Sequence, residues 1–291
     1  MKLIIGCANF GNLYGLKKKN LNLKKIFKII KRAKYHGIYH FDTAQDYKNS
    51  ETFLGNSIKK VYVKKKPLID TKLPKLLYKQ KIGFKIEEIV KSSIKKLNIK
   101  KINILYIHDV HQLTRKNGKK IYSELLKLKK KKLIKKIGIS VYSVNETKKI
   151  LKKFDINVIQ APVNILENKF LNKKFISLKK KKKCVLIARS IFLKGLLLKN
   201  PLKLNKYFKK WENLLTKLNK NLKNKNISTK NWTINFINSN KNFKHFIIGV
   251  SKVSQLNEIV AILKKRKKIP NKANNLNIVS QKLINPKYWS I

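Results

Sequence analysis

The feature that most constrains this chain is a regular alternation of short apolar segments with longer amphipathic ones. Between the apolar segments, apolar side chains recur at helical spacing, as in residues 24–36 and 87–97. Strands that alternate with helices pair in parallel, and nearly continuous apolar character is typical of strands buried on both faces. The pattern therefore predicts an α/β fold, a (β/α)8 TIM barrel. The eight predicted strands are residues 2–6, 38–42, 67–72, 102–108, 134–140, 157–160, 184–188 and 243–249.

The spacing of these segments predicts one domain over residues 1–291. This length suits one such barrel, and no linker rich in Gly, Pro or Ser divides the pattern. The widest interval separates the seventh and eighth strands and predicts an excursion of extra helix and loop at about residues 200–242. Within it, residues 217–230 are interpreted as a helix followed by a mobile loop. The sequence Ser143-Val144-Asn145-Glu146 predicts a capped helix start after the fifth strand.

The charge of the chain is extreme. It has 72 Lys and Arg residues against 13 Asp and Glu residues, a formal net charge of +59. Such an excess would favour a polyanionic partner, either nucleic acid or an anionic membrane. The lysines are scattered over the whole length, however, and the abundance of Lys, Asn and Ile is what an AT-rich codon supply would produce. We therefore attribute the charge to composition and expect no specific nucleic-acid partner, only weak salt-sensitive binding.

Cysteine usage and hydropathy indicate the compartment. Cys7 and Cys184 lie far apart and form no disulfide framework, which is typical of a reducing cytosol. No apolar run approaches the roughly 18 residues that span a membrane. We therefore expect a cytoplasmic protein with no membrane partner. Strong self-repulsion at low salt favours a monomer.

Polar side chains end three consecutive predicted strands. Asp42 ends the second and is followed by Tyr47, Lys72 ends the third, and His108 ends the fourth. The carboxyl ends of parallel barrel strands meet at one mouth, where active sites lie. We therefore predict that these four side chains form a catalytic group. His108 and His111 could also suggest a metal pair, but they would point to opposite faces and no third ligand is evident, so no metal is expected.

A longer pattern begins at Asp42. Carboxylates are rare in this chain, yet Asp42, Asp46 and Glu51 fall within ten residues of one another. The segment from residue 42 to residue 55, DTAQDYKNSETFLG, resembles the aldo-keto reductase signature D-T-A-x-x-Y-G-x-S-E-x-x-L-G, with Lys48 where the family prefers Gly. Residues 188–197 are similar to a short bacterial subgroup often associated with sugar or cell-surface metabolism. Further similar segments follow the family's order: residues 6–11, Lys72, His108, and residues 138–140, 160–164 and 248–258.

The resemblance implies a reductase of an aldehyde, ketone or sugar-like carbonyl that uses a nicotinamide cofactor. Hydride arriving at a carbonyl carbon leaves alkoxide character on the oxygen, which needs a nearby proton donor. Tyr47 would be this general acid, and the ammonium of Lys72 would lower the pKa of its phenol. Asp42 would keep Lys72 charged and oriented. His108 would donate a hydrogen bond to the substrate oxygen.

The resemblance also implies a cofactor site. Ser140 and Gln160 would hold the nicotinamide amide, and the turn after Gly249 would offer free N–H groups to phosphate at the start of a helix near Ser254. Lys252 could pair with a 2′-phosphate, which favours NADPH, with NADH possible. The eight predicted cofactor-binding residues are Ser140, Gln160, Arg189, Ser190, Gly249, Ser251, Gln255 and Glu258.

Two positions depart from the family's cofactor pattern. Arg189 stands where the family commonly stacks a tyrosine on the nicotinamide, and Ile259 stands where an asparagine usually follows the glutamate. Arg189 would either stack on the ring itself or bind an anionic substrate. Two other functions also stay open: a cofactor-binding barrel that has lost catalysis and acts as a sensor or scaffold, and a polyanion-binding protein. The first would bind NADPH without turnover, and the second would bind nucleic acid tightly at physiological salt.

Overall fold

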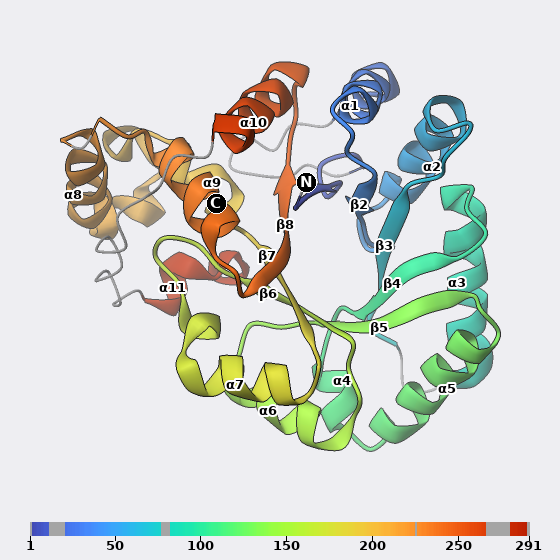
Figure 1. Ribbon diagram of the computed structural model, residues 1–291. Coiled ribbons are helices and arrows are strands. Elements are labelled where there is room, and N and C mark those ends of the chain that lie inside the picture. The colour runs from blue at the N-terminus through green and yellow to red at the C-terminus, as the bar shows by residue number, and fades with distance from the viewer. Residues whose placement is uncertain (1, 12–20, 77–81, 225, 266–279, 290–291) are drawn as a thin grey trace.

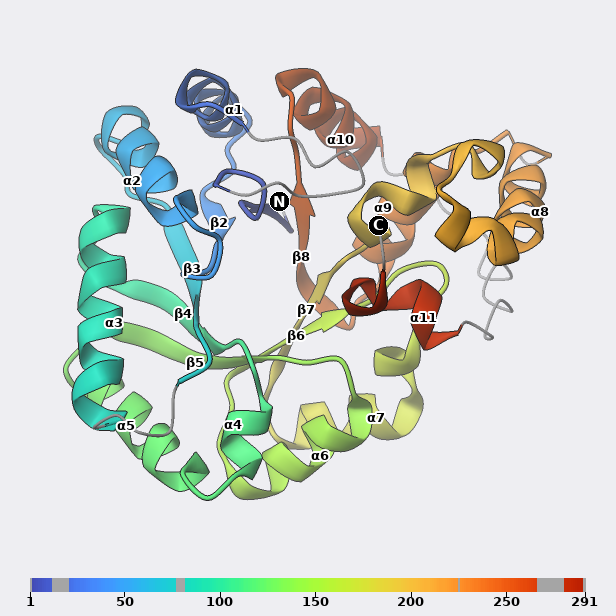
Figure 2. The ribbon, with the colours of Figure 1, turned by 180° about the vertical axis from the view of Figure 1, so that it is seen from behind.

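Eight parallel strands close into a barrel that helices surround, as the computed structural model shows (Figures 1 and 2). The structure describes residues 2–11, 21–76, 82–224, 226–265 and 280–289. Each strand pairs with its neighbours in sequence, and β1 closes on β8 through Leu3 to Gly6 against Phe246 to Gly249. The strands are β1 Leu3–Gly6, β2 His40–Asp42, β3 Leu68–Leu73, β4 Ile102–Ile107, β5 Ile134–Ser140, β6 Val158–Pro162, β7 Val185–Arg189 and β8 Phe243–Gly249.

The predicted barrel is confirmed, and every strand boundary lies within two residues of its predicted position. The α-helices are α1 Leu23–Tyr35, α2 Ser50–Val61, α3 Ile82–Leu97, α4 His111–Thr114, α5 Gly118–Lys130, α6 Val144–Lys153, α7 Lys173–Lys181, α8 Glu212–Lys223, α9 Thr229–Ser239, α10 Val253–Lys265 and α11 Gln281–Ile284. The short 3₁₀ segments within the described residues are η1 Lys169–Leu171, η2 Leu193–Leu198, η3 Pro201–Lys203, η4 Lys206–Trp211 and η6 Pro286–Tyr288.

Helix starts follow the side-chain chemistry of the sequence. The side chain of Ser143 accepts a hydrogen bond from the backbone N–H of Glu146 at 3.3 Å and so caps α6. Asn22 caps α1 in the same way by accepting from Lys25 N at 3.0 Å. The apolar faces of the helices that surround the strands pack on the barrel, whereas those of α8 and α11 do not, and burial of apolar side chains supplies most of the stabilisation.

The inside of the barrel is filled by side chains. An apolar layer contains Ile4, Ile104, Tyr106, Val158, Ile187 and Ile247. Gly138 makes room for this layer, because a Cβ at this position would lie 2.4 Å from Cδ1 of Tyr106. Inside the barrel, His40 of β2 contacts Asp70 of β3, with 2.7 Å between His40 Nε2 and Asp70 Oδ2. Asp70 is fully buried, and burial raises the pKa of its carboxyl. Side chains therefore fill the barrel below its mouth.

The excursion between β7 and β8, which contains η2, η3, η4, α8 and α9, lies beside the barrel (Figure 1). Its apolar side chains belong to a cluster separate from that of the barrel. The segment interpreted as helix and loop, residues 217–230, contains the end of α8 and the start of α9, so the connection between them is short. The C-terminal residues 280–289 pack on it, with the Trp289 ring edge-on to Phe208 at 4.9 Å between centroids. Among the described helices, none is long and apolar enough to cross a membrane.

Candidate active site

A buried ion pair lies at the carboxyl ends of β2 and β3. Lys72 Nζ donates to Asp42 Oδ2 at 2.7 Å and to the backbone oxygen of Thr43 at 2.7 Å. The two charged side chains are only 2% and 6% exposed. Burial lowers the pKa of Lys72, but Asp42 and Tyr47 together raise it above its ordinary value. Lys72 is therefore an ammonium at neutral pH.

Tyr47 lies against this ammonium. Lys72 Nζ is 5.0 Å from the centroid of the Tyr47 ring. Burial raises the pKa of Tyr47, Lys72 lowers it and Asp42 raises it, so that the net pKa is above the ordinary value. The expected lowering by Lys72 is present, but burial outweighs it and the net direction is opposite to the one expected. Tyr47 consequently carries its proton at neutral pH.

His108 follows β4 directly and faces Tyr47. The two rings meet edge to face, 6.1 Å between centroids at an interplanar angle of 85°. Nδ1 of His108 lies 2.8 Å from Oδ2 of Asp46, a residue of the loop between β2 and α2. Asp46 was not among the predicted site residues. The concentration of rare carboxylates in this loop was the signal that could have identified it.

A buried hydrogen-bond network supports the loop that carries Tyr47. The carboxyl of Glu51 accepts from Thr71 Oγ1 at 2.7 Å and from Ser93 Oγ at 3.2 Å, and burial raises its pKa. Gln45 Nε2 donates to Ser93 Oγ at 3.1 Å. Lys48 has φ of +48°, in the left-handed region where glycine is least strained, which accounts for the family's preference for Gly at this position.

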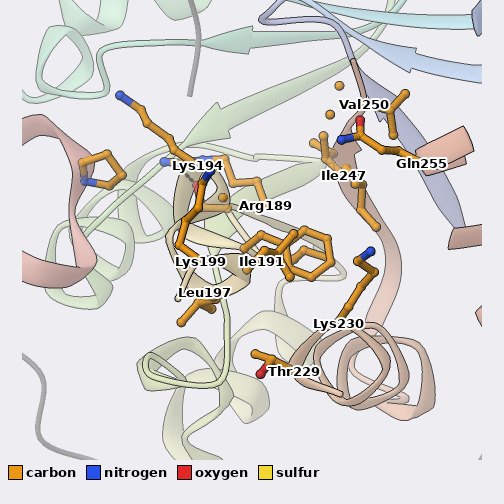
Figure 3. A pocket seen from close by; sticks show the side chains of 18 of the residues that line it. Arg189, Ile191, Lys194, Leu197, Lys199, Thr229, Lys230, Ile247, Val250 and Gln255 are labelled. Carbon is orange, nitrogen blue, oxygen red and sulfur yellow. Dashed lines mark hydrogen bonds between the residues drawn. The ribbon is translucent and has the colours of Figure 1, made fainter. Parts of the chain in front are cut away.

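The mouth opens into a cavity of about 1560 Å³. All twelve predicted site residues line it. They are Asp42, Tyr47, Lys72, His108, Ser140, Gln160, Arg189, Ser190, Gly249, Ser251, Gln255 and Glu258. The close-up view shows Arg189 and Lys194 on one side of this cavity and Ile247, Val250 and Gln255 on another, with Lys230 reaching toward it from α9 (Figure 3).

Arg189 ends β7 and is held by residues that follow β5. Its Nη2 donates to the backbone oxygen of Val141 at 3.1 Å, and its guanidinium carbon is 4.2 Å from the centroid of the Tyr142 ring. Arg189 lowers the pKa of Tyr142. Ser190 and Lys194 follow with φ of +57° and +52°, so the backbone after β7 is strained at the cavity.

The turn after β8 differs from its predicted form. The backbone N–H of Ser251 is not free, because it donates to the Gln255 side-chain oxygen at 2.8 Å. The side chain of Asn9, a residue that the prediction omitted, links β1 to this turn by donating to Val250 O at 2.8 Å and to Ser251 Oγ at 3.0 Å. Glu258 Oε1 contacts Lys230 Nζ at 2.5 Å.

The excursion contributes cations that the motifs did not identify. Thr229 and four lysines between residues 199 and 230 line the cavity: Lys199, Lys220, Lys223 and Lys230. They belong to a segment without a recognisable pattern, in a chain where lysine is common, so their position depended on how the excursion folds back over the mouth.

The residues at the mouth fit the amide of a nicotinamide. Gln160 Nε2 donates to Asp42 Oδ1 at 2.7 Å, and Gln160 also interacts with the Tyr106 hydroxyl, whose pKa it lowers. Gln160 lines the cavity, where its side-chain oxygen could accept a further hydrogen bond from a carboxamide N–H₂. His111, the residue considered with His108 as a metal ligand, contacts Glu146 Oε1 at 2.8 Å. Within the described ranges, no group of three or more His, Cys, Asp or Glu residues could hold a metal ion.

Known proteins share this architecture. An aldo-keto reductase from Bacillus halodurans in its holo form matches with a TM-score of 0.74 and 19% identity, over 99% of this chain and 94% of that one. Glycerol dehydrogenase from Gluconobacter oxydans matches with a TM-score of 0.66 and 18% identity, over 93% and 94%. An aldo-keto reductase from Pseudomonas aeruginosa matches with a TM-score of 0.67 and 16% identity, over 92% of this chain and 90% of that one. At these identities the likeness shows the fold. Curated protein sequences gave no match.

The fold is a (β/α)8 barrel with a cavity at the carboxyl ends of its strands, which is where enzymes of this fold have their active sites. The sequence model of the aldo/keto reductase family matches residues 2–276. The chain therefore belongs to the aldo/keto reductase family. It is an oxidoreductase of carbonyl compounds, in a family that uses nicotinamide cofactors.

Proposed function

We propose that this protein is an NADPH-dependent reductase of an aldehyde, ketone or sugar-like carbonyl, with Tyr47 as the general acid. The observation that carries the proposal is the buried Lys72–Asp42 ion pair directly against a protonated phenol. A stability role alone does not account for it, because a buried ion pair is often no more stabilising than apolar side chains of similar volume.

The chemistry follows from these contacts. The cofactor, when bound, supplies the hydride. Tyr47 donates its proton to the carbonyl oxygen as that oxygen gains negative charge, and the phenolate that remains is stabilised by the Lys72 ammonium. Asp42 and the backbone oxygen of Thr43 hold that ammonium in place. His108 lies beside Tyr47 and would contact the same oxygen. The phenolate regains its proton from solvent through the open mouth.

The cofactor residues are proposed from the cavity. Gln160 Oε1 and Ser140 would hold the carboxamide, and the charged residues of the excursion and of the turn after β8 would hold the phosphates. Lys230, Lys252 and Glu258 all line the cavity, and Glu258 is already paired with Lys230. This local positive charge supports a 2′-phosphate, and therefore NADPH. The remaining proposed contacts are Arg189, Ser190, Gly249, Ser251 and Gln255.

The test combines binding with turnover. NADPH and NADH affinities are measured by fluorescence titration, and NADPH consumption is followed by absorbance with a panel of aldehydes, ketones and aldoses. We expect turnover of at least one carbonyl compound. We also expect NADPH to bind at least about tenfold more tightly than NADH, a difference of about 1.4 kcal/mol in binding free energy. NADPH binding without any turnover would favour a sensor or scaffold. Tight nucleic-acid binding that persists at physiological salt would favour a polyanion-binding protein.

A further inference from the structure

His108 has a carboxylate partner that comes from a different loop. Its Nδ1 lies 2.8 Å from Asp46 Oδ2, across 62 residues of sequence. The edge-to-face contact with Tyr47 fixes the same ring from a second direction. Since Nδ1 is occupied, Nε2 is the ring nitrogen that remains for a molecule in the cavity, which His108 lines.

The partner of Nδ1 decides where the proton of a neutral imidazole resides. An ionised carboxylate only accepts hydrogen bonds, so Asp46 requires a proton on Nδ1. A neutral His108 then has a lone pair, and no proton, on Nε2. A carbonyl oxygen is also an acceptor, so neutral His108 has nothing to donate to it. Only the doubly protonated imidazolium can donate from Nε2 while Nδ1 remains bonded to Asp46.

We propose that Asp46 is a positioning residue that holds His108 in the Nδ1–H form, so that His108 assists carbonyl reduction only as an imidazolium. This inference rests on the proposed function, because it concerns the contact between His108 and the substrate oxygen. Asp46 does not touch the substrate and acts through His108. A His108 ring that carries only the Nδ1 proton should therefore give no assistance to carbonyl reduction.

Other charges surround the ring, and they do not replace Asp46. Tyr47 lies beside the ring, and two cations that line the same cavity, Lys72 and Arg189, act on the pKa of Tyr47. The loop that carries His108 also contains His111 and Asp109, which accepts from the backbone N–H of His111 at 3.1 Å. Of the carboxylates in the described residues, Asp46 is the one that hydrogen-bonds His108.

Because His108 and Asp46 are both partly exposed, Asp46 can be replaced with little effect on folding. The side chains of His108 and Asp46 are 29% and 46% exposed, and ion pairs this exposed add little to stability. Asp46→Asn should therefore fold normally. Its amide can donate to Nδ1, which allows the neutral ring to carry its proton on Nε2. Asp109→Asn is the matched control, because it removes a negative charge next to His108 without changing the Nδ1 partner.

Nitrogen NMR of protein labelled with ¹⁵N-histidine reads the tautomer directly. The chain has five histidines, and His108→Gln assigns the signal. At a pH where His108 is neutral, the wild type and Asp109→Asn should show the Nδ1–H form, and Asp46→Asn should shift toward the Nε2–H form. A wild-type ring that is protonated on Nε2, or an unchanged tautomer in Asp46→Asn, would overturn the proposal.

The pH profile of carbonyl reduction supplies the second reading. In the wild type and in Asp109→Asn, kcat/KM should fall up to about tenfold per pH unit above the titration of His108. Asp46→Asn should lose this descending limb, because its neutral imidazole can donate. A profile of Asp46→Asn identical to the wild type contradicts the proposal. Absence of turnover in the wild type itself would instead contradict the proposed function, and the NMR measurement would still report on Asp46.

Discussion

Lys72 and Asp42 each bury a charge that the other compensates. Their side chains are almost completely inaccessible, and the pair is completed by Thr43 and Gln160. Such a buried pair contributes little net free energy to folding, but the loss of one partner leaves an uncompensated charge in the protein interior. Stability and catalysis can therefore be separated by removing one charge or both.

Lys72→Met should lower the free energy of unfolding by about 3–5 kcal/mol, because Asp42 is left buried without its counter-ion. Urea unfolding followed by circular dichroism measures this loss. The double variant Lys72→Met/Asp42→Asn should recover a large part of the stability and none of the turnover. If the double variant reduced carbonyls at the wild-type rate, the ammonium would not be needed for the chemistry.

The twelve predicted site residues show how far sequence reasoning reaches at this scale. A signature with fixed spacing, together with the rule that strand ends meet at one mouth, was enough to bring them to one cavity. The individual hydrogen bonds were not predictable. Asp46 to His108 and Gln160 to Asp42 join segments 62 and 118 residues apart, and each depends on side-chain rotamers that form only when the barrel closes.

Among the elements, strands were predicted better than the short helical segments. Strands buried on both faces carry a strong apolar signal, so β5 and β8 have the bounds that the sequence indicates. The 3₁₀ segments of the excursion carry no such signal. Their form depends on packing against one another and on the C-terminal residues, as Phe208 and Trp289 show.

The contact between α2 and α3 depends on a glycine of the signature. A Cβ at Gly55 would lie 2.1 Å from Lys96 O and 2.7 Å from Leu97 Cα, and neither backbone atom can move easily. We expect Gly55→Ala to displace α2, and with it the loop that holds Tyr47. It should cost about 1–3 kcal/mol of unfolding free energy by thermal or urea denaturation, and lower kcat as well.

Gly37→Ala provides the comparison for this variant. Gly37 has φ of +69°, but a Cβ there would meet nothing within 4 Å. Its cost should be limited to the conformational strain, about 1–2 kcal/mol, and kcat should stay unchanged. Equal kinetic effects at the two glycines would show that the helix contact does not position the catalytic loop.

For the whole molecule, charge is the dominant property. At a formal net charge of +59, most cations have no acidic partner available. Surface ion pairs such as Lys91 with Glu87 each contribute little. Self-repulsion among like charges therefore outweighs local attraction, and it acts over the screening length of the solution.

Salt should consequently stabilise this protein. Raising NaCl from 10 mM to 150 mM shortens the screening length from about 30 Å to about 8 Å. Scanning calorimetry should show a rise in Tm of at least ~2 °C, on the order of 1 kcal/mol for a chain of this size. A fall in Tm over the same range would mean that attractive pairs, and not the net charge, govern the long-range electrostatics.

Proton donation by Tyr47 is tested most directly by Tyr47→Phe, which removes one oxygen and leaves the ring against Lys72 and His108. The measurement is kcat for a carbonyl turned over by the wild type, together with the Kd for NADPH of both proteins. We expect kcat to fall about 10²- to 10⁴-fold and the Kd to stay within about twofold of the wild type. A Tyr47→Phe variant that kept more than about a tenth of the wild-type kcat would contradict proton donation by Tyr47.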